Sequence, residues 1–128
     1  MGTLKTTMKV ESSDLFPTPV GFTKINENLI AGNFSGFNMI EPAVDPLTTK
    51  LNIDTINSSV YVYAEAPTTN VGSVTIFNAN DVGGDGPIQI CTVTPGDVVF
   101  FHFLGTEDLL ASVSNAGDKL MFFLGERA

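Results

Sequence analysis

The N-terminal residues alternate between polar and less polar side chains. One side of the alternation carries Leu4, Thr6, Met8 and Val10, and the other carries Thr3, Lys5, Thr7 and Lys9. Successive side chains of a β-strand point to opposite faces, so this pattern predicts a half-buried strand. The pattern also suits an arm that pairs with a neighbouring chain.

A segment with two prolines follows this strand. Residues 15–19 read Leu-Phe-Pro-Thr-Pro. Because proline fixes φ and has no N–H to donate, the chain is expected to be extended and irregular here. We interpret the segment as a hinge that divides the chain into an arm at residues 1–16 and a sandwich domain at residues 17–128.

The rest of the chain consists of short segments rich in β-branched and aromatic residues, separated by turn formers. These segments lie at 20–25, 28–31, 50–53, 60–64, 71–77, 88–93, 97–103, 109–113 and 119–124. No segment has a convincing helical period, and turn signals return about every eight to twelve residues. The pattern predicts an all-β fold: a single small β-sandwich or jelly-roll-like domain with an extended N-terminal arm.

Several details of the sandwich are also expected. Residues 60–64 and 120–124 are apolar on both faces, which is typical of central strands. Residues 74–77 and 88–93 should form a hairpin with a long tip, and Pro95-Gly96 suits a type II turn. Residues 114–118 read as a hairpin turn between the last two strands.

The charge balance narrows the possible partners. The 128 residues include fourteen acidic and six basic side chains, for a formal net charge of −8, and only 16% of residues are charged. Nucleic-acid binding and attraction to anionic membranes both draw on clustered Lys and Arg, so neither partner is expected. A surface this poor in charge suits a protein that neighbours partly cover.

Candidate catalytic groups are few. The run from Pro95 to His102 invites comparison with the cupins, but His102 is the only histidine, so one chain cannot supply their several metal-binding imidazoles. Cys91 is the only cysteine, which excludes an internal disulfide. A Cys91–His102 pair would need Asp97 or Glu107 to orient the imidazole. We expect no enzyme activity, no cofactor and no metal.

One loop contains residues that could form a calcium site. Asn80, Asp81 and Asp85 lie in a glycine-rich stretch and could offer oxygen ligands to calcium. Their spacing matches no complete calcium-loop signature, and the same residues recur in ordinary turns. A solvated loop is the preferred interpretation.

Apolar residues in turn-rich surroundings mark candidate contact positions. Phe37 and Met39 lie in such a stretch, either as a loop over the core or as a patch for a partner. The predicted interface residues are Leu4, Met8, Leu15, Phe16, Phe37 and Met39, for each of which core packing is the alternative.

The C-terminal third carries a family resemblance. Residues 93–101 (VTPGDVVFF), 109–113 (LLASV) and 119–126 (KLMFFLGE) resemble small structural proteins of tailed bacteriophages, in particular capsid decoration (cement) proteins. Residues 3–12 (TLKTTMKVES) are similar to virion proteins of marine phages. The resemblance implies a β-sandwich made in the host cytoplasm and attached to the outer surface of the virion capsid. There it would bind the major capsid protein, bridge coat subunits and stiffen the shell, often as a homotrimer.

Other functions compete with this one. A phage tail or fibre adaptor, or a receptor-binding module, would use residues 78–87 as its recognition tip. A carbohydrate-binding β-sandwich is a third class, although the chain has no Trp and only two Tyr, the usual stacking platforms for sugars. The N-terminus has no apolar stretch of signal-peptide type and no segment is long enough to span a membrane, so use without export is expected.

Overall fold

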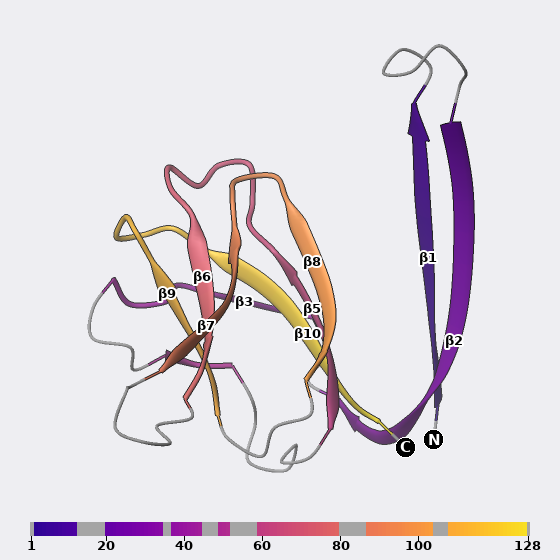
Figure 1. Cartoon of the computed structure of the whole chain (residues 1–128). Coiled ribbons are helices and arrows are strands. Elements are labelled where there is room, and N and C mark those ends of the chain that lie inside the picture. Colours follow the sequence, from indigo (N-terminus) through magenta and orange to yellow (C-terminus); the bar gives the residue numbers. More distant parts are fainter. Residues whose placement is uncertain are drawn as a thin grey trace.

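The computed structural model describes residues 2–12, 20–34, 37–44, 49–51, 59–79, 87–103 and 108–127. Within these ranges the chain forms strands and no helix (Figure 1). The strands are β1 (Gly2–Ser12), β2 (Val20–Phe34), β3 (Asn38–Ile40), β4 (Thr49–Lys50), β5 (Val60–Glu65), β6 (Val74–Asn78), β7 (Ile88–Val93), β8 (Val98–Phe103), β9 (Leu109–Val113) and β10 (Leu120–Arg127). The predicted all-β class is confirmed.

The strands form two antiparallel sheets that pack as a small β-sandwich. The larger sheet has the order β1-β2-β10-β5-β8, with β3 also paired to β10, and the smaller has the order β4-β9-β6-β7. Strand β10 pairs with β5 along Met121–Glu126, and on its other side with β3 and then β2. The central positions predicted for residues 60–64 and 120–124 are therefore confirmed.

Strand β2 joins the arm to the sandwich. Its residues from Val20 to Ile30 pair with β1, and only Ile30 and Phe34 pair with β10. The segments expected at 20–25 and 28–31 are one continuous strand, and the arm is a two-stranded hairpin. The hinge expected at Pro17 and Pro19, and the domain boundary between residues 16 and 17, fall outside the described residues.

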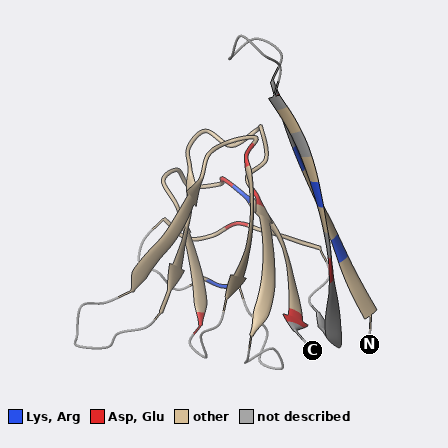
Figure 2. Ribbon diagram, turned by 45° about the vertical axis from the view of Figure 1, so that its right-hand side comes forward, with Lys and Arg blue, Asp and Glu red and all other residues tan. Residues whose placement is uncertain are grey.

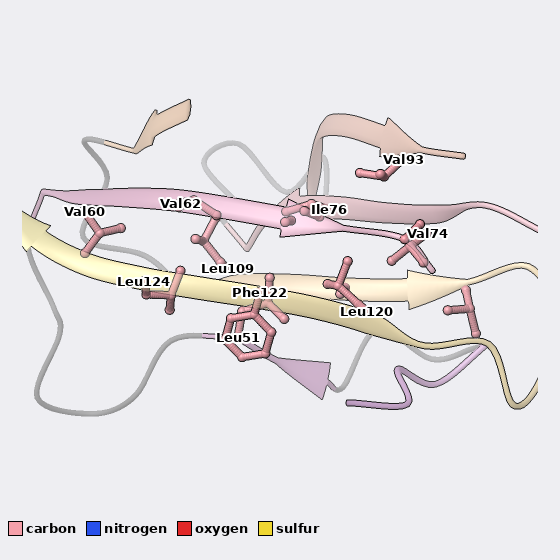
Figure 3. Close-up of a cluster of buried hydrophobic side chains, with 14 residues drawn as sticks. Leu51, Val60, Val62, Val74, Ile76, Val93, Leu109, Leu120, Phe122 and Leu124 are labelled. Atoms are coloured by element: carbon pink, nitrogen blue, oxygen red, sulfur yellow. The ribbon is translucent and has the colours of Figure 1, made fainter. Parts of the chain in front are cut away.

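The core lies between the two sheets. Figure 3 shows Leu120 and Leu124 of β10 and Val62 of β5 gathered with Ile76 of β6 and Leu109 of β9, and all five are at most 2% exposed. Each lies on the inward side of a period-two pattern, because alternate residues of a strand share one face. Burial of such side chains stabilises the fold by roughly 1.5–3 kcal/mol each.

Two of the expected turns are confirmed. Strands β6 and β7 pair as the predicted hairpin. Gly96 has φ +85°, and the Asp97 amide donates to the Thr94 carbonyl (2.9 Å), as in a type II turn. The Thr94 hydroxyl also donates to the Asp97 carboxylate. This turn fixes the start of β8.

The hairpin expected at residues 114–118 is wrong. Strand β9 lies in the smaller sheet and β10 in the larger one, so this connection crosses the sandwich. The local turn does form, with Gly117 at φ +90° and the Asp118 amide donating to the Asn115 carbonyl (3.2 Å). Sequence signals for a tight turn do not reveal which sheet the next strand joins.

A buried polar clamp determines that crossing. Asp118 is 5% exposed, and its two carboxylate oxygens accept from the amides of Val71 (2.9 Å) and Gly72 (2.8 Å). Asn70 donates to the Lys119 carbonyl (2.7 Å) and accepts from the Lys119 amide (2.8 Å). A Cβ on Gly72 would lie 2.1 Å from the Ser114 hydroxyl and 2.3 Å from the Asn115 amide nitrogen, so any larger residue here would require these two side chains to move. The clamp ties the β5–β6 loop to the start of β10.

We predict that Asp118→Ala destabilises the protein by about 1–3 kcal/mol, because it removes the buried carboxylate that accepts from two part-buried amides. Chemical denaturation followed by circular dichroism measures this change. Asp97→Ala, which removes an exposed carboxylate from a turn, serves as the control and should cost less than about 1 kcal/mol. Equal losses in the free energy of unfolding for the two variants would show that the Asp118 carboxylate stabilises the fold no more than an exposed turn carboxylate does.

Candidate protein-contact surface

The larger sheet has a second face that points away from the core. Because Leu120, Phe122 and Leu124 face the core, the alternate residues of β10 face outwards, and the same holds for β5 and β8. Together with β3 and the residue before it, these positions form the aromatic face: Phe37, Met39, Tyr61, Tyr63, Val98, Phe100, Met121 and Phe123. The strand register brings them together in rows across the sheet.

The rings of the aromatic face contact one another across strands. The Phe37 ring lies 5.5 Å from that of Phe123 and meets Tyr63 edge to face, with a centroid distance of 5.9 Å. Tyr61 stacks on Phe100 with centroids 6.0 Å apart and on His102 at 4.8 Å. Such pairs contribute about 0.5–1.5 kcal/mol each beyond their buried area, and they hold the rings in fixed positions.

Much of this apolar surface is open to solvent. Phe37 is 69% exposed, Val98 59%, Met39 53% and Phe100 41%, whereas Tyr61 beneath them is only 7% exposed. Exposed apolar residues are ordinary when scattered singly, but a contiguous patch marks an interaction site. The aromatic face is therefore our candidate functional site.

A carboxylate lies at one end of the aromatic face. Glu65, at the end of β5, pairs in register with Met121 on one side and with Val98 on the other. The Tyr63 hydroxyl donates to its carboxylate (3.1 Å). Burial raises the pKa of the Tyr63 phenol, and the hydrogen bond to Glu65 and the negative charge of Glu65 raise it further. The phenol therefore stays a protonated donor throughout the neutral pH range.

The second apolar feature is the N-terminal arm. Strands β1 and β2 pair from Gly2↔Ile30 to Ser12↔Val20, and Figure 1 shows this ribbon standing apart from the sandwich. Directly opposed residues of an antiparallel pair share a face, so Leu4 and Met8 lie on the same side as Lys24, which is opposite Met8. Met8 is 62% exposed.

Four of the six predicted interface residues fall on these two features. Leu4 and Met8 lie on one face of the arm, and Phe37 and Met39 lie on the aromatic face. Leu15 and Phe16 lie outside the described residues. The contact role of all six stays a prediction.

Sequence reasoning missed the larger part of the aromatic face, including Tyr63, Phe100 and Phe123. The signal was present, because residues 60–64 and 120–124 are apolar on both faces. We interpreted this pattern as burial on both faces. A sheet of a two-layer sandwich has only one face in the core, so the second apolar row lies on the surface of the sandwich.

The structure does not bring the candidate catalytic residues Cys91 and His102 together on neighbouring strands. Cys91 lies on β7 of the smaller sheet and His102 on β8 of the larger one, so they are not on adjacent strands. Burial raises the pKa of the Cys91 thiol, and His102 is engaged with the Ser59 hydroxyl (3.1 Å). Over the described residues, no three His, Cys, Asp or Glu side chains are grouped to hold a metal. Asn80, Asp81 and Asp85 fall outside them.

Comparisons with protein-family models, curated proteins and solved structures find no match to this chain. Across the described ranges, no helix has the length and apolar character needed to cross a membrane.

We predict that Val98→Thr on the aromatic face changes the free energy of unfolding by less than about 0.5 kcal/mol, because this side chain is outside the core. The matched change Val62→Thr, on the neighbouring strand at 0% exposure, buries a hydroxyl and should cost about 1–3 kcal/mol. Urea denaturation of both variants provides the comparison. A loss at Val98 as large as that at Val62 would mean that the aromatic face contributes to stability like a core.

Proposed function

We propose that this protein is a structural, non-enzymatic component of a tailed-phage virion that binds the outer surface of the capsid and bridges coat subunits. The single observation that carries the proposal is the aromatic face, where Phe37, Met39, Val98 and Phe100 expose contiguous apolar surface. The resemblance of residues 93–101, 109–113 and 119–126 to capsid decoration proteins supports the same role.

The arm supports an assembly role independently. A two-stranded ribbon has marginal stability in water unless a further layer covers it. The described arm residues include exposed apolar side chains at Met8 and Ile25, which are 62% and 55% exposed. A neighbouring chain in a lattice would supply the missing layer.

The charge distribution supports the outer side of the capsid. Residues 1–30 carry three lysines and three acidic residues and are neutral, so residues 31–128, with three basic and eleven acidic residues, carry the entire charge of −8. An acidic sandwich would be repelled by packaged DNA. The proposed partner is the major capsid protein, and the proposed state on the capsid is a homotrimer made in the host cytoplasm.

Glycan binding is a second candidate, favoured by one observation. Tyr61, Phe100 and His102 form a stacked aromatic cluster on a sheet face, and aromatic rings are the usual platforms for sugar rings. The tail-adaptor alternative rests on residues 78–87, most of which lie outside the described residues.

We predict that the purified protein binds undecorated phage capsids saturably, at hundreds of copies per particle. Co-sedimentation with capsids, followed by quantification of bound protein, measures the stoichiometry. Phe100→Ser should weaken binding at least about tenfold, as expected when an aromatic anchor leaves an interface.

The matched control for that experiment is Ile90→Ser, which changes a 37%-exposed apolar residue on the smaller sheet. Ile90→Ser should bind like the unchanged protein. Absence of binding to any capsid lattice would overturn the proposal, and saturable binding to a glycan array instead would establish the second candidate.

A further inference from the structure

We propose that the arm of one copy of this chain lies across the aromatic face of a second copy, with Leu4 and Met8 on the aromatic rings and Lys24 beside Glu65. This inference rests on the proposed assembly function and names the partner of its contact surface. It joins the two apolar features of the chain into one contact.

The first argument is the exposure of both surfaces. Within the sandwich the two sheets cover each other, whereas no other strand of the described residues packs against either face of the β1–β2 ribbon (Figure 1). Its own sandwich leaves Met8 62% exposed, while Phe37 is 69% exposed on the aromatic face. Both surfaces would lose apolar contact with water if they met between copies.

The second argument is charge complementarity. On the arm face that carries Leu4 and Met8, the charged described side chain is Lys24. Within the rows of the aromatic face it is Glu65, which lies between Met121 and Val98. One cation and one carboxylate, each beside apolar residues, favour one orientation of the arm and penalise others.

The charge of the whole chain points the same way. Figure 2 shows both basic and acidic residues along the arm, and acidic residues with a few basic ones on the sandwich. Two acidic sandwiches repel each other, whereas a neutral arm carrying lysines can approach one. The arm is therefore the part of this chain best suited to contact a second copy.

The dimensions of the arm and of the aromatic face also agree with each other. Leu4 and Met8 are four residues apart on a strand, a spacing of about 13 Å at roughly 3.3 Å per residue. The row from Met39 of β3 through β10 and β5 to Val98 of β8 crosses three strand spacings, or about 14 Å. The apolar stripe of the arm thus matches the width of the aromatic face.

Such a contact joins different surfaces of the two copies. Contacts of this head-to-tail kind form closed rings when the rotation between copies closes, and a ring of three matches the proposed homotrimer. Every arm and every aromatic face in the ring would then be occupied.

Charge reversal in the full-length protein tests the contact. Lys24→Glu places two carboxylates together, and Glu65→Lys places two ammonium groups together, so each variant alone should associate at least about tenfold more weakly. In a mixture of the two variants, each contact between unlike copies again pairs opposite charges, but a ring of three keeps one contact between like copies, so the mixture should recover association in part. The double variant restores an opposite-charge pair at every contact and should recover association in full. Sedimentation-velocity mass as a function of concentration measures all four samples.

The control is Thr7→Glu, on the opposite face of the arm between Lys5 and Lys9. It adds a negative charge to the arm without touching the proposed contact, so its association should match that of the unchanged protein. Circular dichroism of each variant confirms that the strands are retained.

Full recovery of association in the double variant, with partial recovery in the mixture, would establish the arm contact. Two results would overturn the arm contact. One is an unchanged protein that stays monomeric at every concentration, and the other is association that neither charge reversal weakens. Capsid saturation measured on the same samples separates the two proposals, because monomers that still decorate capsids would sink the arm contact and leave the decoration function standing.

Discussion

A β-sheet has two faces, and a two-layer sandwich buries only one face of each sheet. In this protein that constraint acts most strongly on β10 and β5, the central strands of the larger sheet. Leu120, Phe122 and Leu124 fill the core on one side, while Met121 and Phe123 project from the other. The core accounts for the inner row. The outer row contributes little to holding the two sheets together, and its apolar character is the observation on which the proposed partner rests.

The interactions that hold the sandwich together also position the aromatic face. The clamp of Asp118 and Asn70 carries the chain from β9 in the smaller sheet to β10 in the larger one. Because β10 is thereby fixed between β5 and β3, Phe123 lies beside Tyr63 and Met121 beside Met39. A buried polar interaction at the start of β10 thus helps to fix which rings meet on the aromatic face. The arm enters at the other end of β10, where β2 pairs with Gly125 and Arg127.

The strands and their class were predictable, because alternation and turn residues are local signals. The Pro95-Gly96 turn and the β6–β7 hairpin follow from residues adjacent in sequence. The crossing at residues 114–118 was not predictable, since the carboxylate of Asp118 acts on amides at Val71 and Gly72, far away in sequence. The arm was expected as one strand, and its partner strand β2 was assigned to the sandwich, because an amphipathic strand has the same pattern in either place. Phe37 and Met39 were expected as contacts, but Tyr63 and Phe100 were taken for core.

The central claim is that neighbouring protein covers the aromatic face and the arm in the assembled state. Hydroxyl-radical footprinting with mass spectrometry tests it most directly, on dilute free protein and on protein bound to capsids. We expect Met8, Met39 and Phe100 to be oxidised readily in the free protein and protected several-fold on the capsid, while Ile88 on the smaller sheet is oxidised similarly in both. Equal oxidation of Met39 and Phe100 in the two states would contradict the claim, because a surface that stays open to solvent in the assembly is not its contact.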